Sequence, residues 1–225
     1  MTDAPPPTDA ADQGPDWADA AEARVLDAAT GLIGPGVRWD ATLFARSAAT
    51  AGLSTADAGL LMPQGARDLA ALLWRRHDTQ ALAALGRMDP SALKVRARIR
   101  TAVLARLDAA MADEAAVRAA SLYLGRPQQA SLTLQLGWAT ADALWRWAGD
   151  TSTDENHYSK RALLCAILAS TMAVRLARGE EAGARHLDAR IENVMQFEKL
   201  KAKLPPLQEG LTVLAANLGR LRYRT

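Results

Sequence analysis

The chain has 225 residues, of which 49% are hydrophobic and 23% are charged, so it can bury one sizeable core and requires no second domain. Its formal net charge of +2 is too small to indicate nucleic-acid binding by itself. Alanine, leucine and arginine dominate and aromatic residues make up only 5%, which predicts an all-α protein without β-strands.

The N-terminus, the cysteine content and the longest apolar run bear on where the chain resides. Residues 1–16 contain prolines and aspartates but no lysine or arginine, so they do not resemble a secretory signal and should form a disordered acidic segment. The single cysteine, Cys165, fits a small core residue in a reducing compartment. Residues 162–174, the longest nearly continuous apolar run, are short of the ~20 residues of a transmembrane helix, so no span is predicted.

The first predicted elements resemble a helix-turn-helix. A helix over residues 17–33 should end at Gly34-Pro35-Gly36. Two short helices, over residues 41–51 and 54–61, are separated by a glycine turn, and Met62-Pro63-Gln64-Gly65 closes the second. The spacing is that of the N-terminal module of TetR-type repressors.

The second short helix lacks the side chains that bind DNA. A recognition helix uses basic and amide groups to contact phosphates and base edges. Residues 54–62 contain no lysine or arginine, and Asp57 would repel phosphate. We therefore expect a degenerate helix-turn-helix over residues 17–65 that does not bind nucleic acid.

The next two predicted helices, over residues 66–86 and 90–111, differ in charge. Asp89-Pro90 provides an N-cap and a first helical residue for the second of them. This second helix spreads five cations around its apolar residues, which leaves open whether it has a solvated face or a basic contact surface. The cations are Lys94, Arg96, Arg98, Arg100 and Arg106.

Two helices over residues 128–148 and 154–178 should be the most buried. The first is apolar on two sides, with a polar seam at Gln135, Asp142 and Arg146. The second is apolar all round over residues 162–174, which predicts that it lies at the centre of the protein. Its many small residues permit either close packing of helices or a cavity, and composition leaves both open.

Residues 149–161 form the one dense polar motif of the chain. Helical spacing gathers a carboxylate, an imidazole, a phenol and a guanidinium on one face, from Asp154, His157, Tyr158 and Arg161. Such a face can serve acid–base chemistry, cap a helix or contact a partner, and the Ser152 to Glu155 spacing of a capping box favours the last two.

The chain carries no recognisable catalytic or metal-binding motif. Its three histidines are far apart in sequence and none belongs to an E-x-x-H or H-x-x-x-H pair, so no metal site is predicted. Glycine-rich phosphate-binding loops and a nucleophile elbow are also missing. We therefore predict no catalytic residues, no cofactor and no enzymatic activity.

The C-terminal part predicts a helix over residues 180–200, a break at Pro205-Pro206, and an amphipathic helix over residues 205–225. This last helix could lie in a membrane interface, drawn by anionic lipid, or it could dock on its own core or on a dimer partner. Its predicted membrane-binding residues form one leucine stripe with neighbouring arginines: Leu207, Leu211, Leu214, Leu218, Leu221, Arg220 and Arg222.

The chain resembles the ubiquinone-biosynthesis accessory lipid-binding proteins, the ninth of the coenzyme Q biosynthesis proteins. The resemblance rests on residues 149–161, 190–197 and 60–65, with Asp68 and Leu69. The likeness covers roughly residues 20–203. It implies a TetR-repressor-like homodimer that does not act on DNA, holds an isoprenoid quinone intermediate or a phospholipid, and carries a C-terminal helix on the membrane. A surface at the motif would engage the di-iron demethoxyubiquinone hydroxylase.

The resemblance assigns roles to particular residues. Asp154, Asn156, His157, Tyr158, Lys160 and Arg161 would bind the partner, although His157 replaces a tryptophan that is usual in the family and Glu155 replaces an apolar or aromatic residue. An isoprenoid tail needs a long dry wall. Our hypothesis is that the lipid-binding residues of that wall are Trp138, Trp145, Leu164, Leu168 and Met172.

These inferences define a domain plan and two competing functions. Residues 17–204 would form a TetR-like lipid-binding domain, with a ligand-binding and dimerisation part over residues 66–204. The protein would be cytoplasmic and peripherally attached to the inner face of the membrane, as a non-enzymatic accessory of ubiquinone biosynthesis. The alternative is a TetR-type transcriptional regulator with a small-molecule pocket.

Overall fold

The computed structural model describes residues 17–151 and 155–203, and every regular element in these ranges is a helix, which confirms the all-α prediction. The predicted acidic segment 1–16, the predicted membrane helix 205–225 and Asp154 lie outside the described residues. In chain order the helices are α1 (Trp17–Leu32), α2 (Ala41–Thr50), α3 (Thr55–Leu61), α4 (Ala66–Leu85), η1 (Pro90–Ala92), α5 (Val95–Met111), α6 (Glu114–Leu124), η2 (Pro127–Gln129), α7 (Ala130–Trp147), α8 (Glu155–Arg178) and α9 (Glu180–Lys203).

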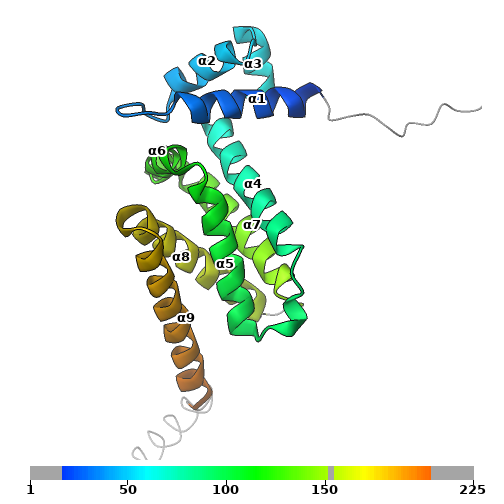
Figure 1. The fold of residues 1–225 in the computed structure, drawn as a ribbon, viewed down its shortest axis with the longest axis vertical. Helices are drawn as coiled ribbons and strands as arrows, with labels where there is room; N and C mark the ends of the chain where they lie inside the picture. The colour runs from blue at the N-terminus through cyan, green and yellow to red at the C-terminus, as the bar shows by residue number, and fades with distance from the viewer. Residues whose placement is uncertain (1–16, 152–154, 204–225) are drawn as a thin grey trace, which may run out of the picture.

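Helices α1 to α3 form a small module at one end of the molecule (Figure 1). Asp40 and Ser54 cap α2 and α3, because their side-chain oxygens accept hydrogen bonds of 3.0 to 3.1 Å from backbone N–H groups of the first turn. The indole N–H of the buried Trp39 donates to the carbonyl of Ala66 (2.9 Å) and ties the module to α4. The two short helices and the turn at Gly52 are thus present as predicted.

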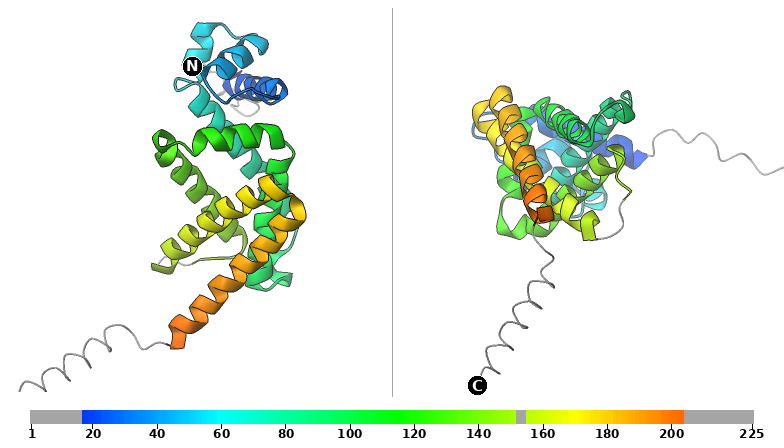
Figure 2. Two further views of the ribbon diagram at one scale, coloured as in Figure 1. Left: turned by 90° about the vertical axis from the view of Figure 1, so that its left-hand side faces the viewer. Right: turned by 90° about the horizontal axis from the view of Figure 1, so that it is seen from below.

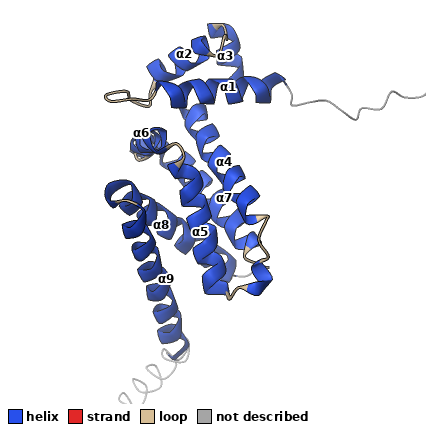
Figure 3. Ribbon diagram, viewed as in Figure 1, coloured by secondary structure: helices blue, strands red, loops and turns tan. Residues whose placement is uncertain are grey.

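Helix α4 leads from this module into a larger body, which is also built of helices (Figures 1, 2 and 3). One buried apolar cluster joins the module to α4, α6 and the start of α7, and a second joins the end of α4 to α5, α7, α8 and α9. The largest side chains of the second cluster include Leu85, Leu107, Leu144, Leu164 and Leu187. This second cluster forms the core beneath the polar motif.

Helix α8 is not enclosed on all sides, and the prediction that it lies at the centre is wrong for the single chain. Its inner face, with Leu164 and Thr171, is buried. Its opposite face exposes Ala162, Ala166 and Ala169. Composition could not distinguish these faces, because an alanine methyl group presents so little apolar area that exposing it costs little.

Helices α8 and α9 pack unusually closely at their hairpin. Gly179 joins them with a φ of +84°, a conformation that favours glycine. Farther along α9, a Cβ atom at Gly183 would lie only 2.9 Å from the Cβ of Arg175. The absence of a side chain at residue 183 therefore sets the distance between the two helices.

The basic helix α5 directs most of its cations to partners within the chain. Four of the five predicted cations have partners within the chain, yet Arg96 and Arg100 stay partly exposed, so the choice between a solvated face and a basic contact surface stays open. These contacts are Arg96 with Glu192 (2.5 Å), Arg98 with the carbonyls of Leu93 (2.8 Å) and Ala148 (2.9 Å), Arg100 with Asp188 (2.7 Å), and Arg106 with Asp78.

Candidate functional site

The polar motif begins at a tight turn after α7. Gly149 has a φ of +86°, and a Cβ there would lie 3.1 Å from Nη1 of Arg98. The same Nη1 donates to the carbonyl of Ala148 (2.9 Å), and the indole N–H of Trp147 donates to the carbonyl of Leu85 (3.0 Å). The turn is therefore held by side chains from α5 and α7, in a conformation that suits glycine.

A buried ion network lies directly under the motif. Arg161, which is only 2% exposed, donates through Nε to Oδ1 of Asp142 (2.6 Å) and through Nη1 to Oδ2 of Asp150 (3.1 Å). Nη1 also donates to the carbonyl of His157 (3.1 Å). One guanidinium thus joins α7, the turn and the first described part of α8.

Lys160 completes the network from the side. Its Nζ lies 2.6 Å from Oδ1 of Asp150 and 5.5 Å from the ring centroid of Trp145, whose indole N–H donates to the carbonyl of Lys160 (3.1 Å). Arg161 and Lys160 were expected to contact a partner. Both cationic groups bond inside the chain, but the buried Arg161 supports the surface from beneath, whereas the side chain of Lys160 is 37% exposed and forms part of the surface.

The aromatic residues of the motif lie on the outside. Tyr158 is 65% exposed, and its ring centroid lies 6.1 Å from that of Trp138 and 5.1 Å, edge-on, from that of His157. The side chain of Asn156, like Asp154, is not among the groups that the structure describes. Of the predicted partner-binding residues whose side chains the structure describes, His157, Tyr158 and Lys160 therefore reach the surface at least in part.

An exposed stripe of uncharged residues continues from Tyr158 along α8. Its members recur at helical spacing on one face of α8, and α7 adds two side chains beside them. Exposed apolar side chains that gather on one face can mark an interaction site. We call this the α7–α8 surface, and it consists of Leu134, Trp138, Tyr158, Ala162, Leu163, Ala166, Ala169 and Ala173.

This part of the chain is also the part that a protein-family model matches. The model described as COQ9 matches residues 130–198, which cover α7, α8 and most of α9. The chain is 31% identical to the mitochondrial ubiquinone biosynthesis protein COQ9 of Rattus norvegicus, over 88% of this chain and 67% of the rat protein. The chain belongs to the COQ9 family.

Two further members of the COQ9 family show the same extent of similarity. The proteins of this name from Homo sapiens and Bos taurus are 28% and 29% identical to the chain, in both cases over 88% of this chain and 66% of the relative. The chain therefore spans about two thirds of the length of these relatives. The resemblance inferred from the polar motif is confirmed at the level of the family.

Sequence reasoning missed the two carboxylates that pair with Arg161 beneath the polar motif. Asp142 and Asp150 hold Arg161, and neither was among the predicted site residues. A signal for Asp142 was present, because it stands in the polar seam of an otherwise apolar helix. Helical spacing alone could not show that Arg161 points toward α7 and away from solvent.

The five predicted lipid-binding residues do not line one common surface. Leu164 and Leu168 are buried in the second core cluster, and Trp145 and Met172 pack against it partly buried. Trp138 alone reaches the α7–α8 surface, where it contacts Tyr158. Nearby, the half-buried Cys165 has a thiol whose pKa is raised by burial.

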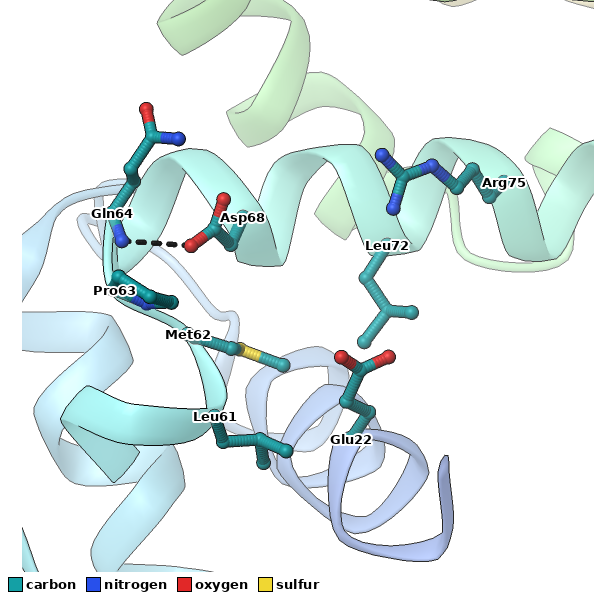
Figure 4. A pocket seen from close by; sticks show the side chains of 8 residues that line it. All are labelled: Glu22, Leu61, Met62, Pro63, Gln64, Asp68, Leu72 and Arg75. Carbon is teal, nitrogen blue, oxygen red and sulfur yellow. Dashed lines mark hydrogen bonds between the residues drawn. The ribbon is translucent and has the colours of Figure 1, made fainter. Parts of the chain in front are cut away.

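A pocket of about 240 Å³ lies elsewhere, between α1, the α3–α4 turn and the start of α4 (Figure 4). Burial, and then the nearby Asp19, raise the pKa of its Glu22, and the backbone N–H of Gln64 donates to Asp68 (2.7 Å). A small pocket with charged walls does not suit an isoprenoid tail. Its lining residues are Glu22, Leu61, Met62, Pro63, Gln64, Asp68, Leu72 and Arg75.

The described part of the chain contains neither a metal-site cluster nor a membrane-spanning helix. Within residues 17–151 and 155–203, no three His, Cys, Asp or Glu side chains are grouped as a metal site would require. Among the helices that the structure describes, none has the length and hydropathy needed to cross a bilayer.

Proposed function

We propose that the protein is a non-enzymatic accessory of ubiquinone biosynthesis that binds an isoprenoid quinone intermediate or a phospholipid. It would present this lipid to the demethoxyubiquinone hydroxylase at the membrane surface. The single observation that supports this most directly is the exposed, uncharged α7–α8 surface, because it lies within the region matched by the COQ9 family model.

The chemistry of this surface suits an apolar ligand or partner. Between Arg161 and Arg175 the α8 sequence contains no charged residue, and its exposed alanines leave a shallow, smooth face. Tyr158 and Trp138 stand at one end as amphipathic rings of the type that dominates binding energy at protein interfaces. The alanine stripe would hold the isoprenoid chain or the second copy of a homodimer, and the aromatic end would contact the hydroxylase.

Extraction of bound lipid tests the central proposal. The full chain, purified without detergent and extracted with organic solvent, should yield an isoprenoid quinone or phospholipid by mass spectrometry. Leu163→Glu places a charge on the α7–α8 surface and should lower the yield severalfold. Leu60→Glu, on the exposed face of α3, is the matched control and should leave the yield unchanged. An empty extract from the unmodified protein would refute lipid binding.

Contact with the hydroxylase makes a separate prediction for Tyr158. Because this ring is 65% exposed, Tyr158→Asp should fold normally, yet it should weaken binding to the purified di-iron hydroxylase by about tenfold, the scale of a lost aromatic anchor. Calorimetric titration provides the measurement, and Leu60→Asp, at the same control position on α3, is the matched control. Equal affinity for the Tyr158 variant and the unmodified protein would place the hydroxylase contact elsewhere.

A further inference from the structure

The connection between α4 and α5 exposes large apolar side chains beside cations. Met88 is 49% exposed and Val95, the first residue of α5, is 55% exposed. Arg87 and Lys94, next to them in sequence, are exposed as well. Over residues 86–98 four cations stand against one carboxylate. The α4–α5 connection therefore combines exposed apolar side chains with a positive charge.

The end of α9 lies at the same pole of the molecule. Nη1 of Arg96 lies 2.5 Å from Oε2 of Glu192, which joins the first turn of α5 to α9. One turn farther along α9, Met195 is exposed. Figures 1 and 2 show this pole at the opposite end from α1 to α3. We call Arg87, Met88, Lys94, Val95 and Met195 the basal surface.

The pairing of nearby cations leaves the basal surface positive. Arg98, beneath it, donates to two backbone carbonyls, whose oxygens carry only partial charges and do not neutralise the guanidinium. Asp89 accepts hydrogen bonds from the backbone N–H (2.8 Å) and the hydroxyl (2.7 Å) of Ser91. The cations Arg87, Lys94, Arg96 and Arg98 outnumber the carboxylates Asp89 and Glu192, so these groups carry a formal net charge of +2 that attracts anions.

We propose that the basal surface is a membrane contact that rests on anionic lipid headgroups. Single apolar side chains surrounded by lysine and arginine insert at the boundary of headgroups and acyl chains, and each cation near an anionic surface adds attraction. Three apolar side chains are too few for a protein interface, which covers about 800 Å² on each partner. The proposal rests on the proposed function in that it gives the lipid-presenting protein a fixed orientation on the bilayer.

The position of this pole adds a second, independent reason. After Lys203, the last residue of α9, the chain has 22 further residues, whose sequence carries a leucine stripe and three arginines. Lys199, Lys201 and Lys203 precede them in the last part of α9. The chain therefore enters its most lipid-attracting sequence from the pole that bears the basal surface, so both can engage one membrane.

Vesicle binding of the full chain tests this inference. Val95→Asp should raise the apparent dissociation constant for vesicles of phosphatidylcholine and phosphatidylglycerol by about fivefold. The variant loses a valine side chain that would be buried in the lipid, and its new carboxylate is repelled by the anionic headgroups. Aspartate at the first position of a helix is favourable, so the variant should fold. Leu60→Asp, which changes an 81% exposed leucine at the opposite pole, should alter binding less than twofold. Flotation on a density gradient gives both values.

The outcomes separate this inference from the proposed function. If the unmodified chain binds these vesicles and Val95→Asp binds them equally well, the basal surface is not a membrane contact, whereas lipid binding at α7–α8 is unaffected. If the unmodified chain fails to bind any vesicle, both proposals fall. Lys94→Glu should weaken binding to the mixed vesicles and leave binding to pure phosphatidylcholine vesicles unchanged. An equal loss of binding to both kinds of vesicle would contradict recognition of anionic headgroups.

Discussion

Replacing Arg161 with leucine should lower the free energy of unfolding by about 3 kcal/mol, because it removes a buried cation that bonds to two carboxylates. Asp142 keeps Arg146 (2.8 Å) and the almost fully buried Asp150 keeps Lys160 (2.6 Å), so the loss should lie at the lower end of the range for a broken buried ion pair. The carbonyl of His157 also loses a hydrogen bond, so the motif should loosen. Urea unfolding followed by circular dichroism gives the value.

A surface pair provides the matched control for Arg161. Arg185 lies 2.5 Å from Glu181 on the exposed side of α9, and Arg185→Leu should cost less than about 0.5 kcal/mol. Arg161→Lys keeps the charge but cannot reach both carboxylates in the same geometry, so it should fall between the two. A loss for Arg161→Leu no larger than that of the control would show that the network does not support the fold.

Replacing Arg106 with leucine should be similarly costly, at about 3–5 kcal/mol. Arg106 is buried in α5, where it pairs with Asp78, stacks over the ring of Trp74 at 5.3 Å and donates to its carbonyl at 3.3 Å. Without Arg106, Asp78 would keep only the hydroxyl donor of Thr140 (2.8 Å). The folded state would then contain a largely buried carboxylate without a cationic partner.

A double variant distinguishes an unpaired charge from a simple loss of packing. Adding Asp78→Leu to Arg106→Leu removes the orphaned carboxylate, and the hydroxyl of Thr140 can still donate to the carbonyl of Leu136 (3.0 Å). At least about 2 kcal/mol of the lost stability should return. If the double variant is less stable than Arg106→Leu, the carboxylate is not the source of the loss.

The pH dependence of Arg106→Leu gives a second check. Burial raises the pKa of Asp78 in the folded protein, and the pairing with Arg106 opposes this rise. Without Arg106 the folded-state pKa should rise further above the unfolded value. A carboxyl whose pKa is raised by folding stabilises the protein only where it is protonated, and that stability is lost as pH rises through the folded pKa. The deficit of the variant should therefore shrink as pH falls toward 4.

The helical architecture could be predicted from sequence because local signals agree with one another. Gly34 to Gly36 ends α1 as expected, and Asp40 and Ser54 act as caps. The start of α5 differed, because Asp89-Pro90 opens the short helix η1 and α5 itself begins only at Val95. Propensity and capping act over a few residues, so they fix helix ends well and helix subtypes less well.

The arrangement of the candidate site depends on contacts that sequence patterns do not encode. Helical spacing predicted that Tyr158 and Arg161 share one face of a helix. In the structure the ring of Tyr158 is exposed, whereas the side chain of Arg161 is buried. A long arginine side chain can turn toward a carboxylate on a neighbouring helix, and only packing decides that direction. The alanine stripe of α8 was ambiguous for the same reason, since small residues fit both a buried and an exposed face.

The distance between α8 and α9 at Gly183 determines where the far end of α9 lies. From residue 183 to Lys203 the helix extends about 30 Å at the usual rise of 1.5 Å per residue. A side chain at residue 183 would push the pivot away from Arg175, and a tilt of about 5° there would move the far end by roughly 2–3 Å. The absence of a side chain at residue 183 thereby sets the direction of α9, the last helix that the structure describes.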